Sequence, residues 1–175
     1  VDLFACTNES AVDLSGLVSG PTTTGTWSGG AGTFSPDPDT LTAQYTPTAA
    51  EVTAGSVTLT LTSTNNGNCL AENDQVTIDF VAPPFANFNY NFACEGDTTY
   101  FTDFSLNGFG TIINWTYDFG DSNGDTNPDT YNIYTSSGTF SASLIVESDA
   151  GCFDTIVQNV IVNEKPNANF SYTST

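Results

Sequence analysis

Oxygen-bearing side chains recur at short intervals after the middle of the chain. Asp121, Asn123 and Asp125 stand at alternate positions, and Asp129 follows four residues later. Alternating carboxylate and amide oxygens around a glycine are how calcium-binding loops surround a hard cation. The run does not complete an EF-hand, because no glutamate stands at the twelfth position. The spacing predicts a candidate calcium site, and the more frequent outcome of such clusters, a solvated acidic turn, stays open beside it.

Catalytic chemistry finds little support in the sequence. Histidine is absent and the only basic residue is Lys165, so a general base would have to be a carboxylate. Paired carboxylates can hydrolyse glycosides. However, the aspartates stand beside glycine, asparagine or proline, where aspartate typically makes local hydrogen bonds in turns. We therefore predict a protein that is not an enzyme.

Four cysteines are spread through the chain: Cys6, Cys69, Cys94 and Cys152. No two are spaced as Cys-x-x-Cys, and with no histidine this argues against a zinc site. An even number of cysteines indicates two disulfides in an oxidising compartment, with free buried thiols as the alternative. Three pairings are open, and we favour the one with a single bond in each half, Cys6–Cys69 and Cys94–Cys152.

The chain is strongly acidic, with a net charge of −19 from one lysine and twenty aspartates and glutamates. Such a surface repels nucleic-acid phosphates and anionic lipid headgroups, so we expect no nucleic-acid partner and no direct membrane insertion. No apolar run is long enough to cross a bilayer. With no methionine and no signal peptide, the 175 residues are expected to be an excerpt from a larger protein.

Strict alternation surrounds Trp115. The odd positions are Ile113, Trp115, Tyr117 and Phe119, and the positions between them are polar. Aromatic and β-branched residues at every second position are typical of a half-buried strand. The same period returns further on, at Gly138, Phe140, Ala142, Leu144 and Val146.

Residues 115–121 read Trp-Thr-Tyr-Asp-Phe-Gly-Asp. This run resembles the signature of the PKD (polycystic kidney disease) domain, in which an aromatic residue and a spacer precede Trp-Asp-Phe-Gly-Asp-Gly. Tyr117 stands in place of the family's tryptophan, and Ser122 in place of its last glycine. The resemblance covers about residues 84–163 and implies an immunoglobulin-like β-sandwich. It implies no ligand, because such domains serve as spacers and as binding modules.

The first half has strand signals of its own. Apolar residues alternate with threonine or aspartate over residues 57–62 and 76–80, as in half-buried antiparallel strands. Turn signals about every ten residues indicate a sandwich. We expect Trp27 and Phe34, which bracket a glycine-rich stretch, to lie in its core. One helical turn is expected at 47–52.

Residues 27–34 read Trp-Ser-Gly-Gly-Ala-Gly-Thr-Phe, and residues 45–51 read Tyr-Thr-Pro-Thr-Ala-Ala-Glu. With Gly-Ser-Val-Thr-Leu-Thr-Leu at 55–61, they resemble the immunoglobulin-like repeats of giant Bacteroidota surface adhesins. These include gliding-motility adhesins of the SprB type, and the match covers residues 3–80. The resemblance implies export by type IX secretion, a cell-surface location and an adhesive role.

A short proline-rich linker ending in Pro83-Pro84 is expected between the two halves. The predicted fold class is therefore all-β, as tandem immunoglobulin-like antiparallel β-sandwiches joined by this linker. The predicted domains are an adhesin-type repeat at 1–82 and a PKD-like sandwich at 83–163.

A short sequence occurs twice. Pro-Phe-Ala-Asn-Phe-Asn-Tyr at 84–90 shares five of seven positions with Pro-Asn-Ala-Asn-Phe-Ser-Tyr at 166–172, which begins 82 residues later. A period of this size indicates a tandem array of whole domains. Residues 164–175 are therefore expected to be the first strand of a further PKD-like repeat.

The bacterial resemblance also implies candidate modification sites. Bacteroidota attach O-glycans at Asp-Ser/Thr followed by an aliphatic residue or threonine, and three triplets fit, with Thr40, Thr98 and Thr155 as acceptors. The triplet is short, so chance matches are the alternative. Sequons for N-linked glycans are discounted because the resembling families are bacterial.

Together these features predict non-catalytic repeat modules of a large extracellular adhesin or surface filament, acting at the cell surface as stalk and interaction modules. The expected partners are neighbouring repeats of the same chain or filament, and surface polysaccharide or glycans. No cofactor is expected beyond the candidate calcium ion. The alternatives are accessory polysaccharide-binding or spacer modules of a secreted hydrolase, and a filament subunit that polymerises by strand donation.

Overall fold

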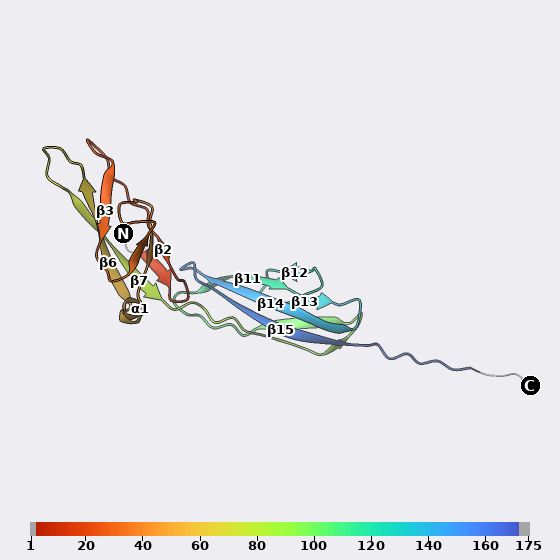
Figure 1. Ribbon diagram of the computed structural model, residues 1–175. Helices are drawn as coiled ribbons and strands as arrows, with labels where there is room; N and C mark the ends of the chain where they lie inside the picture. Colours follow the sequence, from red (N-terminus) through yellow and green to blue (C-terminus); the bar gives the residue numbers. More distant parts are fainter. Residues whose placement is uncertain (1–2, 172–175) are drawn as a thin grey trace, which may run out of the picture. The chain divides into compact units, whose positions relative to one another are not determined.

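The computed structural model describes residues 3–171, and the chain divides into two compact units with the boundary between Pro83 and Pro84. Nearly all of the regular secondary structure described in both units is β-strand (Figure 1). The strands coloured red to yellow-green in Figure 1, up to β7 (Asn73–Val81), belong to the first unit, and the green-to-blue strands after β7 belong to the second. The predicted all-β class is confirmed.

The first unit is a sandwich of two sheets with one short helix. Its strands are β1 (Leu3–Cys6), β2 (Val12–Asp13), β3 (Thr24–Ser28), β4 (Thr33–Ser35), β5 (Gln44–Thr46), β6 (Ser56–Thr64) and β7 (Asn73–Val81). One sheet has the order β1-β7-β6-β3 and the other β2-β5-β4. Neighbouring strands are antiparallel except β1 and β7, which run parallel. The prediction of purely antiparallel sheets did not include this pair.

The core of the first unit forms from alternating side chains. On β6 the apolar positions Val57, Leu59 and Leu61 are buried, and the threonines between them face outward. Trp27 is buried, and Phe34 is half-buried and packs against the same core. The core positions predicted for these two aromatics are confirmed.

The helix α1 (Ala49–Ala54) begins at a complete capping box. The Thr48 Oγ1 atom accepts a hydrogen bond from the Glu51 backbone N–H (3.3 Å), and the Glu51 carboxylate accepts one from the Thr48 N–H (2.7 Å). Gly55 ends the helix at φ = 89°, a left-handed conformation that favours glycine. The short helix predicted at 47–52 is therefore present, at 49–54.

The second unit is also a two-sheet sandwich. Its strands are β8 (Phe88–Tyr90), β9 (Ala93–Cys94), β10 (Thr98–Asp103), β11 (Ile112–Asp118), β12 (Gly124–Asp125), β13 (Thr130–Ile133), β14 (Gly138–Ser148) and β15 (Phe153–Asn163). The sheets have the orders β12-β11-β14-β15-β9 and β13-β10-β8. Here too one edge pair, β15 with β9, is parallel. The long hairpin of β14 and β15 is the blue pair in Figure 1.

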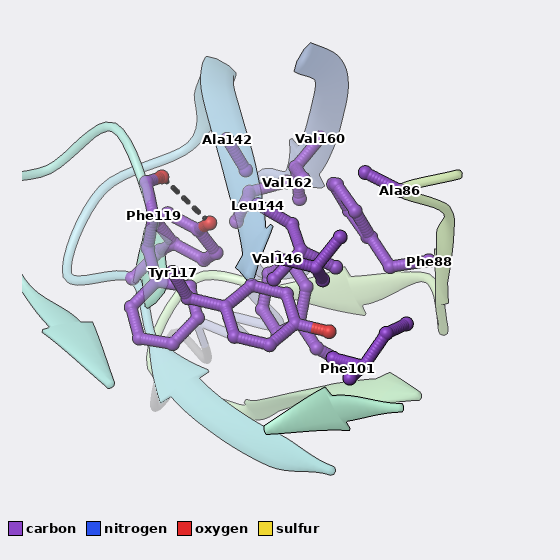
Figure 2. Packing of buried hydrophobic residues seen from close by; sticks show 12 residues of the cluster. Ala86, Phe88, Phe101, Tyr117, Phe119, Ala142, Leu144, Val146, Val160 and Val162 are labelled. Carbon is purple, nitrogen blue, oxygen red and sulfur yellow. Dashed lines mark hydrogen bonds between the residues drawn. The ribbon is translucent and has the colours of Figure 1, made fainter. Parts of the chain in front are cut away.

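Side chains of both sheets fill the core of the second unit. Figure 2 shows Phe88, Phe101, Tyr117, Leu144 and others directed into one interior. The dashed line marks the hydrogen bond that the buried Tyr134 hydroxyl donates to the Phe119 carbonyl oxygen (2.9 Å). Five of the twelve buried residues of this core are aromatic, so their rings form a large part of the packing between the sheets.

One predicted core position in the second unit is wrong. The register of β11 against β14 shifts between Ile112 and Asn114. Because of this irregularity Ile112 is buried, whereas Ile113, predicted to face the core, is 51% exposed. Further along the strand the predicted alternation holds, since Tyr117 and Phe119 are buried and Trp115 is half-buried.

Residues 164–171 follow β15 and belong to no strand, and their side chains are exposed. The predicted first strand of a further repeat falls on this segment and on residues 172–175. The latter lie outside the described residues. The strand stays a prediction.

Candidate functional site

The acidic cluster of residues 121–129 lies in the connection between β11 and β13. Gly120 and Ser122 have φ values of 78° and 76°, which turn the chain so that β12 pairs back on the end of β11. The Asp121 carboxylate accepts hydrogen bonds from the backbone and side-chain N–H groups of Asn123 (3.1 Å each) and from the Asn132 amide (2.8 Å). Asp121 therefore stabilises the turn in which it lies.

Asp125 is satisfied by different donors. Its carboxylate accepts from the Thr130 hydroxyl, from the backbone of Thr126 and Asn127, and from the Asn127 amide. These bonds, the one from Thr130 first, hold the pKa of Asp125 below its usual range. Asp129 bonds to a different strand: its Oδ1 atom accepts a hydrogen bond from the backbone N–H of Asp103 on β10 (3.0 Å).

The carboxylates of the candidate calcium site are thus directed to separate protein donors. Within residues 3–171, no group of three or more acidic, cysteine or histidine side chains is placed to hold a metal ion. This arrangement favours the acidic turn over a calcium site formed by Asp121, Asn123, Asp125 and Asp129. Calcium binding by these four residues stays a prediction from the sequence, and the donors already in place make us expect a weak effect or none.

Asp103 connects strands of the two sheets. It accepts hydrogen bonds from the Trp115 indole N–H (2.8 Å) and from the Ser105 backbone N–H (2.9 Å). The Tyr117 hydroxyl nearby donates to the Pro128 carbonyl oxygen (3.2 Å). Burial, and then the negative charges of Asp103 and Asp129, raise the pKa of Tyr117. The Tyr117 hydroxyl therefore stays protonated and has a structural role.

A second hydrogen-bond network joins the glycine-rich loop of the first unit to α1. The Glu51 carboxylate accepts from the Tyr45 hydroxyl (2.7 Å) and from the Ala31 backbone N–H (2.7 Å). Partial burial disfavours the charged form, but the hydrogen bonds outweigh it and lower the pKa of Glu51 from 4.5 to about 2. A side chain at Gly30 would begin 2.0 Å from the Tyr45 hydroxyl. Gly30 and Gly32 thus allow the loop and Tyr45 to approach each other closely.

The side chains with the largest pKa shifts in residues 3–171 all have structural partners. The groups with the largest pKa shifts, Tyr45, Glu51, Tyr117 and Tyr134, are all engaged in the structural hydrogen bonds above. Histidine is absent from the sequence. A general acid–base pair would need a group placed to exchange protons with a substrate, and none of these four is.

The predicted disulfide pairs are wrong. Cys69 and Cys94 are free thiols, whereas Cys6 and Cys152 are disulfide-bonded. The strand registers explain why neither predicted pair forms. Cys6 lies level with Val81 at the end of β7, but Cys69 lies in the loop before β7 begins. At about 3.3 Å per residue, the strand separates them by roughly 26 Å, against the ~5.5 Å that a disulfide allows.

The second pair fails for the same reason. Cys94 lies level with Asn163 at the end of β15, and Cys152 immediately precedes its start. The length of β15 puts roughly 33 Å between them. Both errors come from the parallel edge strands. β1 places Cys6 at the far end of β7 from Cys69, and β9 places Cys94 at the far end of β15 from Cys152.

The candidate O-glycosylation residues differ in accessibility. Thr155 is exposed on the outer face of β15. Thr98 is half-buried, and Thr40 is half-buried with its hydroxyl donating to Asp37 Oδ1 (3.1 Å). All three stay predictions, and Thr155 is the most accessible acceptor.

An exposed set of aromatic residues on the second unit was not predicted. Tyr131 pairs with Tyr100 across β10 and β13, whereas Tyr134 is buried. Phe104, just after β10, is exposed close to Tyr100. The alternation of residues 98–103 could have shown that Tyr100 and Phe101 face opposite sides, but not which side is buried.

Comparison with known families matches residues 81–162 to the model of the PKD domain. These residues form a PKD domain. The PKD1 domain of the Vibrio cholerae metalloprotease PrtV is 30% identical over 46% of this chain and 98% of its own, with a TM-score of 0.43. The PKD1 domain of Vibrio anguillarum Epp is 24% identical over 49% of this chain and 99% of its own, with a TM-score of 0.45.

Over the whole length, the fibronectin(III)-like modules of Clostridium thermocellum CbhA share the fold. They cover 99% of this chain and 94% of their own, with 12% identity and a TM-score of 0.51. No curated protein matches the chain. The PKD assignment and the tandem sandwich fold place the protein among extracellular modular proteins, whose PKD domains are generally non-catalytic. Within residues 3–171 no helix is long and apolar enough to span a membrane.

Proposed function

We propose that this chain supplies non-catalytic repeat modules of a large extracellular bacterial adhesin or surface filament, acting as stalk and interaction modules. The observation that carries the proposal is the repeated sequence at 84–90 and 166–172. In the PKD domain, Ala86 and Phe88 of the first copy are 1% and 3% exposed and belong to the core. The second copy repeats these core-forming residues as Ala168 and Phe170, as a further domain of the same kind requires.

The exposure of the second copy supports the same interpretation. Phe170 is 88% exposed and lies in no strand. Burying this aromatic side chain in a second domain, as Phe88 is buried in the first, would lower the free energy of the folded protein. Neighbouring repeats of the same chain or filament are therefore proposed partners, and the exposed faces of the domains are proposed to contact surface polysaccharide.

The location is proposed from chemistry and from the sequence resemblance. Disulfide-bonded cysteines such as Cys6 and Cys152 persist in oxidising compartments. The resemblance of residues 3–80 to SprB-type repeats supports the finer proposal of type IX export to the surface of a gliding bacterium of the Bacteroidota. The acidic surface keeps densely arrayed repeats apart by charge repulsion.

The test uses an antibody raised against this chain. On intact producing cells it should label the surface, and brief external protease treatment should remove the label. The immunoblot should show a chain far larger than two domains. An antigen found instead in the culture medium, on a chain that carries hydrolytic activity, would establish the accessory-module alternative. Loss of surface label in a strain lacking type IX export would support the finer proposal, and unchanged label would overturn it.

A further inference from the structure

The outer face of the sheet β13-β10-β8 presents aromatic rings to solvent. The buried positions of β10 are Thr99 and Phe101, so Tyr100 between them faces outward. Tyr131 stands opposite Tyr100 on β13, and each is 60% exposed. Their ring centroids are 6.4 Å apart. Two large rings thus lie side by side on one face of the PKD domain.

A groove of about 310 Å³ lies beside this pair. It is lined by Asn89, Tyr90, Asn91, Tyr100, Thr102 and Phe104. Phe104, 55% exposed, follows the last residue of β10, and its backbone N–H donates to the Asn87 carbonyl oxygen (2.9 Å). The groove therefore has aromatic side chains from the middle of β10 and from the residue after it, with amide and hydroxyl groups beside them.

Hydrogen bonds hold the walls of the groove in place before any ligand binds. The Asn91 side-chain oxygen accepts from the Tyr100 backbone N–H, and the Tyr90 hydroxyl donates to the Asn159 carbonyl oxygen (2.8 Å). The Asn89 side-chain oxygen accepts from the Tyr90 N–H (2.9 Å). A site fixed in this way loses little conformational entropy on binding.

The charge of the groove selects among ligand classes. All six lining residues are uncharged, although the chain carries a net charge of −19. An anionic ligand would be repelled by the surrounding carboxylates, and a cationic one would find its counter-charges elsewhere on the domain. A neutral ligand is the class that this surface fits.

The mixture of side chains narrows the choice further. An apolar protein segment would cover Asn89, Asn91 and Thr102 without satisfying their polar atoms, which carries a desolvation cost. A sugar ring satisfies both kinds of group, because its C–H face packs on an aromatic ring and its hydroxyls exchange hydrogen bonds with amides. Small-ligand sites commonly combine apolar walls with a few placed polar groups.

We propose that this groove binds a neutral polysaccharide. One sugar ring packs against Tyr100 and Phe104, with its hydroxyls bonded to Asn89 and Thr102. Tyr131 extends the platform to a neighbouring ring of the same polymer. The site deepens the interaction role proposed above, on which it rests, by naming the ligand class and the residues that bind it.

The test is native affinity electrophoresis of the full chain in gels that contain hydroxyethylcellulose, glucomannan, mannan or soluble starch, with alginate as the acidic comparison. The wild type should be retarded by at least one neutral polymer and not by alginate. Tyr100→Ala and Tyr131→Ala should each weaken the affinity by about tenfold, as expected for central aromatic contacts. Asn89→Asp should weaken it too, because it adds a charge to the groove.

Phe170→Ala is the matched control, since it removes an exposed aromatic residue outside the groove and should leave the retardation unchanged. Circular dichroism of each variant separates loss of binding from loss of fold. No retardation by any neutral polymer, retention equal to wild type in both tyrosine variants, or stronger retention by alginate would overturn the proposal.

Self-association is a further outcome to measure. If sedimentation shows that the wild type dimerises and that Tyr100→Ala abolishes the dimer, the face is an interface between copies, and the polysaccharide proposal is wrong. Loss of the polysaccharide proposal can be distinguished from loss of the proposed function, because antibody labelling of intact cells does not depend on Tyr100. If intact cells are labelled but no polysaccharide binds the groove, the chain is a surface stalk module without this binding site.

Discussion

The two units place similar cores beneath different exteriors. In the first unit the outer positions of β3, β6 and β7 are polar, and more than half of them are threonine. Threonines pair across strands, as in the contact between the Thr58 and Thr77 hydroxyls (3.3 Å). In the PKD domain the corresponding outward positions of β10 and β13 include Tyr100 and Tyr131. Cross-strand threonine pairs stabilise a sheet whose face stays hydrated. Exposed tyrosine rings, in contrast, favour binding, because covering them with a ligand lowers the free energy.

The contrast extends over the surface. Among the exposed large apolar side chains of residues 3–171, Phe4 is the one aromatic in the first unit. The second unit exposes eight: Phe85, Phe92, Tyr100, Phe104, Phe109, Tyr131, Phe153 and Phe170. A sandwich constrains only its inward positions, so the outward ones are free to specialise. We infer that the first unit serves mainly as a spacer and the PKD domain as the binding module.

The largest expected effect is the loss of either core. Leu59→Ala in the first unit and Leu144→Ala in the PKD domain each remove a fully buried side chain, and each should lower the unfolding free energy of its own unit by about 2–5 kcal/mol. Each unit contains one tryptophan, Trp27 or Trp115. Urea unfolding followed by fluorescence, with the other tryptophan changed to phenylalanine, therefore reports each unit separately.

The matched control is Thr58→Ala, which removes an exposed side chain and should cost less than about 1 kcal/mol. Leu59→Ala should move only the Trp27 signal and Leu144→Ala only the Trp115 signal. A shift of both signals by one substitution would mean that the units do not unfold as separate cores.

The next effect is confined to the first unit and depends on pH. The pKa of Glu51 is about 2 in the folded protein and 4.5 ordinarily. Its ionised form therefore contributes fully to the stability of the first unit above pH 4.5, and this contribution is lost as the pH falls toward 2. After allowance for solvent screening, this contribution is about 1–2 kcal/mol. Glu51→Gln should destabilise the first unit at pH 7 by this amount and flatten its stability between pH 5 and pH 2.

Urea unfolding at several pH values, followed through Trp27, checks this prediction. The exposed Glu72 in the loop before β7 offers the control, and Glu72→Gln should leave the profile unchanged. An acid sensitivity equal in Glu51→Gln and wild type would show that other carboxylates govern the first unit.

A smaller effect concerns the thiols. Cys69 is exposed and Cys94 half-buried, both as free thiols, so alkylation of the native protein should label Cys69 quickly and Cys94 more slowly. Cys6 and Cys152 should stay unlabelled until a reductant is added. Peptide mapping without reduction that recovers a Cys6–Cys69 or Cys94–Cys152 peptide would contradict the strand registers.

The smallest expected effect is that of calcium. The carboxylates of Asp121, Asp125 and Asp129 already accept protein hydrogen bonds, so the melting temperatures in calcium and in EDTA should agree within about 1 °C. A calcium-specific rise that magnesium does not reproduce and that Asp125→Asn abolishes would instead establish the calcium site.

Local patterns were sufficient to predict much of the fold. Alternation located β6, β7, β11 and β14, and the run at 115–121 indicated the PKD domain. The cysteine pairing could not be predicted, because it depends on the parallel edge pairs β1–β7 and β9–β15, which bring together segments far apart in the sequence. The exposure of Ile113 depends on the irregularity after Ile112, which has no glycine or proline to mark it.

The candidate site was less predictable than the fold. The acidic run 121–129 was found, but the donors that occupy its carboxylates, Thr130 and Asn132, come from the next strand. The aromatic groove was missed because alternation is symmetric: Tyr100 and Phe101 are equally good core residues until the partner sheet covers one of them.

The division between spacer and binding module is tested most directly by a nuclear magnetic resonance titration. The isotope-labelled full chain would be titrated with a hexasaccharide cut from the neutral polysaccharide that retards it most. Amide shift changes should concentrate at residues 89–91, 100–104 and 131 and leave the threonine face of β3, β6 and β7 unchanged. Changes centred on that threonine face, or none on the outer face of β13-β10-β8, would contradict the account.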